Sequence, residues 1–461
     1  MGTKEILDYV RNTPGNTNPS VLKGMLDSIA GGGSGGGNKE TAIIEKTISG
    51  SYENSTATFI GNNAFQSCSA LESVYFPSAS MINYAAFSGC TTLVNASFPL
   101  VESVGQYAFW RCSSLASASY PLATSVGYGA FSACRELSCV YFPLLEVVST
   151  AAFDDCEALT SVVIPSATLI GDLAFIGCSS LKNVNFPLVS SIGNAAFGTC
   201  ALENANFPSV TKIGTGTFAN CYSLSSVNMP LLKDIPSSAF EFCGALENVN
   251  FPSVSTIGTN AFHSCVTLKS IDFSSASVIH SSAFNYCIEL ENINLPSVTI
   301  LSGDAFRWCT ALKRVHLPIA STIGFMAFAL CSNLEHVSLP MARNIMASAF
   351  DHCEKLSTVI LSNTANATNS LYGSVFKSCY NLLSVYLLAS TMYTLSNSSA
   401  FLSTPIGNYT TSTGGVYGSI FVLESLYSRY ISSTNWSYFS SRFVSLTDAQ
   451  VSKVLASGTH L

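Results

Sequence analysis

Apolar residues recur along this chain with a period of 22 residues. Each repeat reads Ala-Phe-x-x-Cys-x-x-Leu, then Val-x-Phe followed by Pro, then Ile or Val five residues after the Pro. Fifteen repeats keep this register, and a single step of 21 residues interrupts it before the last looser steps. The phenylalanines stand at positions 65, 87, 109, 131, 153, 175, 197, 218, 240, 262, 284, 306, 328, 350 and 376.

Each repeat predicts one short strand and one turn. Leu-x-x-Val-x-Phe ends in the period-two alternation of a strand, and the Pro that follows ends the strand because it lacks an N–H. The i, i+3, i+6 spacing of Phe, Cys and Leu predicts a helical or 3₁₀ turn opposite the strand. Cys200 and Leu202 stand one residue closer than in other repeats, so we expect a tightened turn there with the strand ladder in register.

A fixed short period predicts a stacked solenoid, in which each repeat buries its apolar side against its neighbours. Parallel strands lie about 4.8 Å apart, so fifteen units would extend over roughly 70 Å. The phenylalanine, cysteine and leucine columns are therefore the expected core.

The motifs Leu-x-x-Val-x-Phe-Pro at 181–187 and Ile-Gly-x-x-Ala-Phe-x-x-Cys at 192–200 resemble the BspA-like class of bacterial leucine-rich repeats. The resemblance covers about residues 60–390. It implies a right-handed, curved α/β solenoid of about fifteen units with a parallel sheet on its concave face, and a role in adhesion or binding. The position of the usual Asn ladder differs, so backbone groups in that turn must be satisfied in another way. Its occupants here include Ala79, Val101, Ala123 and Leu145.

The sequence outside the repeats predicts further segments on both sides of the solenoid at 65–400. Residues 1–30 predict two short amphipathic helices, which either dock and oligomerise or fold back as a capping hairpin. A Gly-rich linker at 31–38 and an N-terminal lead-in and cap at 39–64 follow. Residues 401–461 predict a C-terminal cap.

The C-terminal cap carries its own local signals. The sequence predicts a strand at 418–422 and a helix at 423–430. Thr447 and Gln450 have the spacing of a helix capping box, and Leu446 and Val451 are placed for a hydrophobic staple. This tail and the N-terminal leader also resemble segments of phage and prophage structural proteins, which implies a tail-associated or surface adhesin.

Composition narrows the function. Only 10% of the residues are charged against about 25% in an average domain, and the net charge is −7. We expect no nucleic-acid partner, because binding phosphates requires a basic stripe. No secretory signal or uninterrupted apolar run of about 20 residues occurs, so we expect no membrane insertion. The localisation stays open, with a virion or extracellular surface favoured over the cytoplasm.

Fifteen of the sixteen cysteines stand in one column, three residues after each Phe. Their 22-residue spacing suits neither a zinc site nor a disulfide, because parallel side chains at strand spacing are too far apart to bond. We predict buried, reduced thiols, with Cys139 alone exposed on a strand. The chain has none of the usual nucleophile, zinc or phosphate-loop motifs, so we predict no catalytic residue, metal or cofactor. The acid pair Asp154 and Asp155 is interpreted as a solvated turn.

The outward positions of the strands carry the candidate ligand-binding residues. Read across the repeats they form a stacked Asn column with one Asp, which either binds ligand or is satisfied by amide–amide hydrogen bonds. A second column alternates in charge from Glu247 to Glu335, and pairing between neighbouring strands explains it. The candidates are Tyr75, Tyr141, Asn185, Asn206, Asn228, Asn250, Asp272, Asn294, Arg314, His316 and His336.

Three of these candidates form the sharpest patch. Arg314 and His316 lie in one repeat and His336 in the next. The planar donor fork of arginine and the mixed donors and acceptors of asparagine suit a glycan or an acidic peptide. The alternative is an ordinary solvated face.

These observations favour a non-catalytic binding or adhesion protein, with a host or cell-surface protein or glycan as its partner. A structural spacer or scaffold of a virion or surface assembly, held as a homo-oligomer through residues 1–30, is the alternative. An intracellular scaffold is favoured only by the reduced thiols.

Overall fold

A computed structural model describes residues 48–363, 368–409 and 411–457. The chain divides into two units, unit 1 up to Phe207 and unit 2 from Pro208. The helices expected at 1–30 and the linker at 31–38 lie outside the described residues, and they stay predictions.

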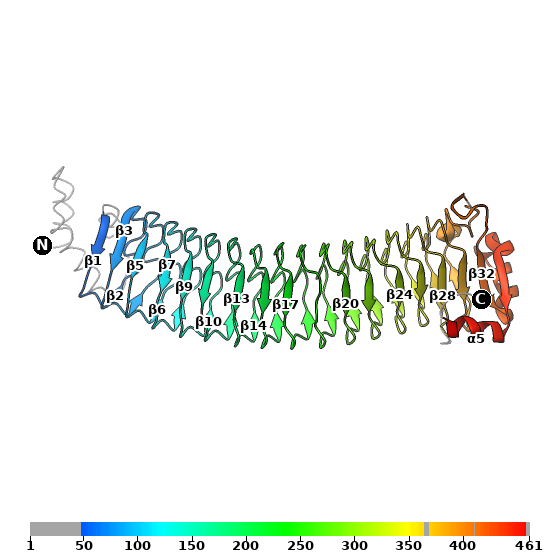
Figure 1. The fold of residues 1–461 in the computed structure, drawn as a ribbon, viewed down its shortest axis with the longest axis horizontal. Coiled ribbons are helices and arrows are strands. Elements are labelled where there is room, and N and C mark those ends of the chain that lie inside the picture. Colours follow the sequence, from blue (N-terminus) through cyan, green and yellow to red (C-terminus); the bar gives the residue numbers. More distant parts are fainter. Residues whose placement is uncertain (1–47, 364–367, 410, 458–461) are drawn as a thin grey trace. The chain divides into compact units, whose positions relative to one another are not determined.

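Both units are built from parallel strands stacked in a solenoid, with about 18 turns of chain of about 22 residues among the described residues. Each turn places strands in two rows, and Figure 1 shows these rows within each unit. We call the longer strands the first row and the two- or three-residue strands the second row. The count exceeds the predicted fifteen because chain before Phe65 and after Phe376 also contributes strands.

The first row of unit 1 comprises β1 (Ser49–Glu53), β3 (Ala70–Tyr75), β5 (Asn95–Ser97), β7 (Ser117–Ser119), β9 (Cys139–Tyr141), β11 (Ser161–Val163), β13 (Asn183–Asn185) and β15 (Asn204–Asn206). Its second row comprises β2 (Phe59–Ile60), β4 (Met81–Ile82), β6 (Ser103–Val104), β8 (Ser125–Val126), β10 (Val147–Val148), β12 (Leu169–Ile170) and β14 (Ser191–Ile192). Strand partners lie 22 residues apart, as Met81 and Ser103 do. β13 and β15 pair with a separation of 21 residues and no register break, which confirms the expectation for the shortened repeat.

The first row of unit 2 comprises β17 (Ser226–Asn228), β20 (Ser270–Asp272), β22 (Asn292–Asn294), β24 (Arg314–His316), β26 (His336–Ser338), β28 (Thr358–Leu361), β30 (Ser384–Leu387), β32 (Ser419–Leu423) and β33 (Phe443–Leu446). Its second row comprises β16 (Lys212–Ile213), β18 (Asp234–Ile235), β19 (Thr256–Ile257), β21 (Val278–Ile279), β23 (Ile300–Leu301), β25 (Thr322–Ile323), β27 (Asn344–Ile345), β29 (Asn369–Leu371) and β31 (Tyr393–Leu395). The sequence did not predict the second row, since two residues are too few to show an alternation.

The segment around each repeat phenylalanine forms consecutive tight turns instead of the predicted helical turn. We call these segments the turn row. The residues two before and two after each phenylalanine have left-handed backbones, such as Ala85 (φ 49°) and Gly89 (φ 77°) beside Phe87. A right-handed helix cannot continue through such residues. Instead, every second N–H donates to the next turn of chain, as Phe87 N does to the Ala108 carbonyl at 2.7 Å.

The predicted core is confirmed. Phe109, Cys112 and Leu115 are completely buried, as are their counterparts along both units. Phenylalanine rings of successive turns stack face to face, with centroids 5.2 Å apart for Phe87 and Phe109 and an interplanar angle of 6°. The apolar side of every turn is thereby shielded by its neighbours.

The cysteine column is buried, and it also hydrogen-bonds the backbone. Each thiol donates to the phenylalanine carbonyl of the preceding turn, as Cys112 Sγ does to Phe87 O at 3.0 Å. All cysteines are free, and Cys139 alone is exposed, as predicted. At the position of the usual Asn ladder, local turns satisfy the backbone, and Ala123 N donates to the Tyr120 carbonyl at 3.1 Å.

The C-terminal part of unit 2 holds the helices of the described residues, namely η1 (Ser398–Phe401), η2 (Thr411–Thr413), η3 (Glu424–Leu426), α4 (Tyr427–Ser432), η4 (Trp436–Arg442) and α5 (Asp448–Ser457). The predicted strand forms as β32, and the predicted helix forms as η3 and α4. The capping box is confirmed, because Thr447 N donates to Gln450 Oε1 at 2.9 Å. No helix in the described part of the chain has the length and apolar character needed to cross a bilayer.

Candidate binding surface

The outward side chains of the first row form the candidate binding surface. In unit 1, Tyr75 on β3 and Tyr141 on β9 are 43% and 44% exposed. They are not neighbours, since the turns that contain β5 and β7 come between them. Asn185 and Asn206 stand opposite each other on the paired strands β13 and β15, so these two amides are adjacent.

In unit 2 the polar column is partly satisfied by its own members. Asn294 Nδ2 donates to Asp272 Oδ1 at 2.9 Å across β22 and β20. This contact favours the amide-ladder interpretation for that pair. Asn228 lies at the end of β17 and is exposed, whereas Asn250 is exposed but lies outside any strand.

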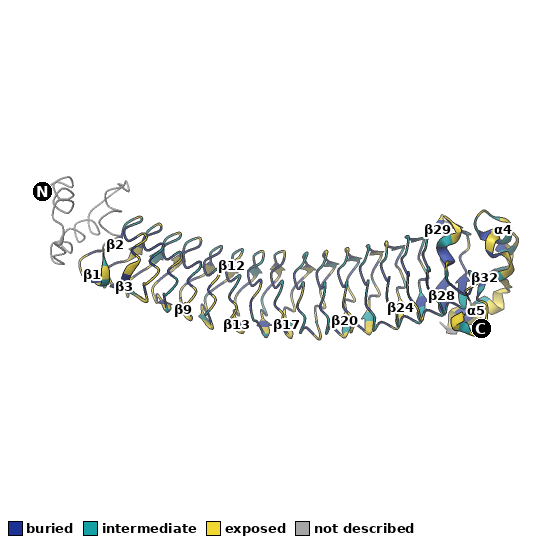
Figure 2. Ribbon diagram, turned by 90° about the horizontal axis from the view of Figure 1, so that it is seen from above, coloured by how far each residue is buried: buried dark blue, intermediate teal, exposed yellow. Residues whose placement is uncertain are grey.

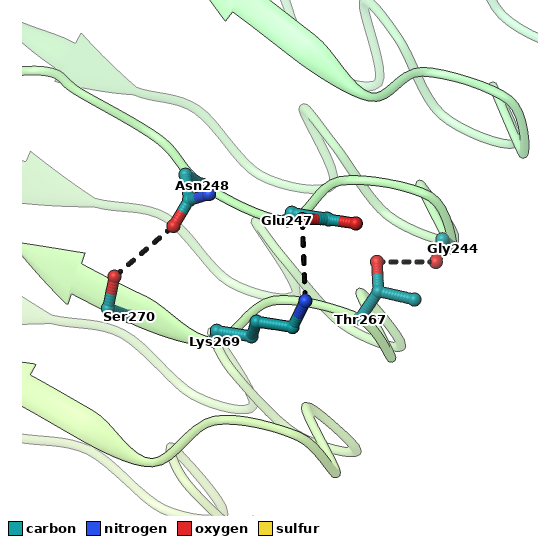
Figure 3. Close-up of polar contacts among 6 residues, drawn as sticks. All are labelled: Gly244, Glu247, Asn248, Thr267, Lys269 and Ser270. Atoms are coloured by element: carbon teal, nitrogen blue, oxygen red, sulfur yellow. Dashed lines mark hydrogen bonds and ion pairs between the residues drawn. The ribbon is translucent and has the colours of Figure 1, made fainter.

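The turn that contains Asn250 interrupts the first row, and only Asn248 bridges to Ser270 there. Figure 3 shows the side chains at this place: Ser270 Oγ donates to Asn248 Oδ1 at 3.3 Å. Beside them Lys269 Nζ lies 3.4 Å from Glu247 Oε2. The charged column is therefore paired here as expected.

Arg314, His316 and His336 lie together on adjacent strands. Arg314 is the register partner of His336 across β24 and β26, and His316 is the partner of Ser338. His316 Nδ1 lies 3.2 Å from Ser338 Oγ. Arg314 and His316 are exposed and His336 is half-buried, so a guanidinium fork, two imidazoles and a hydroxyl share one small area.

Helix α5 bounds this area, a feature that the sequence analysis missed. The next outward positions of the same column, Ile360 and Tyr386, are 4% and 2% exposed, because they pack in one cluster with Val454 of α5. Figures 1 and 2 show α5 beside β28 and β32. The exposed polar face thus ends at β26. Apolar residues at two outward strand positions were the signal that something covers them.

The eleven candidates therefore do not converge on one site. Each turn contributes one or two of them at strand spacing, and they divide between units 1 and 2. The structure brings together the pair Asn185 and Asn206, the pair Asp272 and Asn294, and the trio at 314, 316 and 336.

Comparison with known families identifies the repeat. The model described as "BspA type Leucine rich repeat region" matches in six copies over residues 47–160, 146–269 and 277–406. The chain belongs to this family. The comparison with curated proteins gave no match.

Solved structures include similar BspA-type neighbours. A leucine-rich repeat protein from Bacteroides ovatus is 24% identical, with a TM-score of 0.54, and the match covers 76% of this chain and 84% of that chain. A leucine rich cell surface protein from Faecalibacterium prausnitzii is 25% identical with a TM-score of 0.39, over 67% of this chain and 84% of that one. The first of these shows that the two proteins share a fold.

This BspA-type chain also exposes an aromatic cluster that the sequence analysis missed. Tyr84, Tyr107 and Tyr128 lie on three consecutive turns of the turn row in unit 1, and Trp110 lies beside Tyr107. The available signal was the presence of aromatic residues outside the repeating core positions, which the regular phenylalanine columns obscured.

The remaining chemistry of the BspA-type repeats is limited. No group of three His, Cys, Asp or Glu side chains within the described ranges could hold a metal ion. Burial, together with the charge of Asp155, raises the pKa of Asp154, whose carboxylate accepts a hydrogen bond from Ser132 Oγ at 3.4 Å. Asp155 itself is exposed, in line with the interpretation of this pair as a solvated turn.

Proposed function

We propose that this BspA-type protein is a non-catalytic binding protein of the adhesion class, whose first row contacts a protein or glycan on a cell surface. Leucine-rich repeats stack into extended surfaces that bind and, as a class, carry no catalytic chemistry. Family membership therefore supports both the binding role and the expectation that the protein is not an enzyme.

The observation that carries the proposal is the character of the outward first-row face. Its side chains up to β26 are mainly uncharged and polar, with Arg314 and His316 exposed beside the boundary set by α5. The solenoid is held together by its buried columns, so the fold does not require these particular outward residues. Buried Arg and aromatic contacts dominate the affinity of many interfaces, and we assign the leading contact to Arg314.

The remaining candidates support this assignment as flanking contacts. The Asp272 and Asn294 pair presents a fixed carboxylate and amide, and the Asn185 and Asn206 pair presents two amides in unit 1. Such groups offer donors and acceptors in fixed positions, which suits sugar hydroxyls or a peptide backbone. Tyr75, Tyr141, Asn228 and Asn250 would widen the contact without adding charge.

A binding panel tests the proposal. The folded full chain is screened on immobilised glycans and on whole cells, beside the variant with Arg314→Ala, His316→Ala and His336→Ala. The triple variant should lose about tenfold or more in affinity. A control variant with Lys233→Ala and His280→Ala, both exposed residues of unit 2 outside the trio, should bind as the parent does. A clean negative for folded protein on both panels would contradict the proposal.

The sequence of residues 1–30 supports one alternative, a structural spacer or scaffold in a virion or surface assembly. An apolar stripe on a segment too short for its own core suits oligomerisation. This alternative expects light scattering to report an oligomer that disappears when residues 1–37 are deleted, with no ligand on either panel. Ligand binding by the truncated chain would instead support the adhesion role.

A further inference from the structure

An aromatic cluster lies on the turn row of unit 1, at a place that no first-row contact uses. The ring centroids of Tyr84 and Tyr107 are 6.0 Å apart, and those of Tyr107 and Tyr128 are 5.1 Å apart. Trp110 lies 6.3 Å from Tyr107, and the guanidinium carbon of Arg111 lies 4.3 Å from the Trp110 ring centroid. One chain of contacts thus joins five side chains from three consecutive turns.

The fold does not require aromatic residues at these positions. Tyr107 has a left-handed backbone with φ 56°, a conformation that costs a bulky residue roughly 1–2 kcal/mol. The same position in neighbouring turns is held by Ala85, Gly129 and Ala151. Tyr84 and Tyr128 are 48% and 41% exposed, so burial does not account for them either. Backbone strain that burial does not repay is a feature of binding sites.

The chain beside Tyr107 is shaped around its ring. A Cβ atom built on Gly129 would lie 3.0 Å from both Cδ1 and Cε1 of Tyr107, closer than a normal contact. The tyrosine ring therefore rests against a glycine that leaves room for it. A ring held in place before a ligand arrives loses little conformational entropy when the ligand binds.

The chemistry of the cluster selects its ligand. A pyranose sugar has an apolar face of C–H groups and a rim of hydroxyls, and tyrosine offers a ring face and a hydroxyl in one side chain. Tyr84 and Tyr128 stand at 86° and 74° to Tyr107, so the rings present differently oriented faces. Burial, and then a hydrogen bond with Tyr128, raises the pKa of Tyr107, which keeps this phenol a neutral donor.

A cationic ligand is disfavoured, since Arg111 already places a positive charge over Trp110. We propose that Tyr84, Tyr107, Tyr128, Trp110 and Arg111 form a second binding site, specific for a neutral oligosaccharide of pyranose sugars. One tyrosine per turn, spaced 5–6 Å apart, favours a chain of several sugars over a single one. The site stands apart from the first-row surface, and it does not depend on the function proposed for that surface.

The test uses the full chain on an array of neutral oligosaccharides, followed by calorimetry with a length series of the strongest hit. Affinity should rise from one sugar to three and then level off. Tyr107→Ala should weaken binding about tenfold or more while the thermal midpoint is kept, since alanine already occupies the equivalent position at Ala85. Tyr84→Ala and Tyr128→Ala should each weaken binding less.

Two matched variants make the result specific. Gly129→Ala keeps every aromatic residue but moves the Tyr107 ring, and it should also weaken binding; Ala133 holds the same φ of 59°, so this change is compatible with folding. Tyr141→Ala removes a tyrosine of similar exposure from the first row and should leave binding unchanged. The proposal is overturned if no oligosaccharide binds, if an apolar peptide binds instead, or if Tyr141→Ala weakens sugar binding while Tyr107→Ala does not.

Discussion

At the residue scale, the cysteine column shows how one small side chain performs two tasks. Cys134 fills space in the core and donates its thiol hydrogen to the Phe109 carbonyl at 3.1 Å. A thiol is a weak donor that costs little to bury, so the column satisfies backbone carbonyls without bringing a strongly polar group into the core. Only Cys139, on the outward face of β9, lacks this environment.

This difference predicts selective thiol chemistry. Burial raises the pKa of thiols such as Cys112, Cys156 and Cys243, and it also blocks access to reagents. A thiol reagent should therefore modify one cysteine quickly in the folded protein and all sixteen in denaturant. Cys139→Ser should abolish the fast reaction. Rapid labelling of several thiols under native conditions would show that the column is not buried.

A second prediction at this scale concerns Asp154. Burial and Asp155 raise its pKa above the ordinary value of 3.8, so the folded protein binds this proton more tightly than the unfolded chain does. Its ionisation therefore lowers stability as the pH rises from about 4 through the raised pKa. Asp154→Asn, which keeps an acceptor for Ser132, should raise the thermal midpoint at pH 7 and have no effect near pH 3. An equal gain at both pH values would assign the effect to packing instead of charge.

At the element scale, the sequence predicted the repeat, the strand and the core columns, but it misjudged the turn. Phe, Cys and Leu at i, i+3 and i+6 satisfy a helix and a pair of tight turns equally well. The distinction lies in backbone sign, and residues such as Ala195 (φ 47°) carry no outward mark of it. The second row escaped because two residues such as Met81 and Ile82 show one exposed and one buried position and no period.

The left-handed positions lead to a backbone prediction. Ala195 has a left-handed φ and is half-buried, whereas its neighbour Ala196 is completely buried and does not. Ala195→Gly should leave stability unchanged or raise it by up to about 1 kcal/mol, because glycine adopts this conformation without strain. Ala196→Gly should cost about 1–2 kcal/mol through lost burial and chain entropy. Urea unfolding of both variants checks this, and equal losses would contradict it.

At the scale of the whole molecule, each unit must also close the apolar surface that its repeats leave open. The first row of unit 2 changes character at β28, where the outward residues are buried under the C-terminal cap. The candidate site could be predicted as a set of columns, but its boundary could not, since α5 reaches back from residues 448–457 to strands near 360 and 386. Contacts of that sequence separation leave no local pattern.

Removing α5 should therefore uncover the apolar face it protects. A chain that ends at Leu446 would expose Ile360, Tyr386 and Leu388, which pack in one cluster with Val454. We expect binding of a hydrophobic dye, self-association in light scattering and a lower thermal midpoint, because an uncovered apolar patch on parallel strands favours association. A chain that lacks only residues 458–461 should behave as the parent does. If the shorter chain stayed monomeric and dye-free, α5 would be dispensable, and the exposed first-row face would extend beyond β26 to β28 and β30.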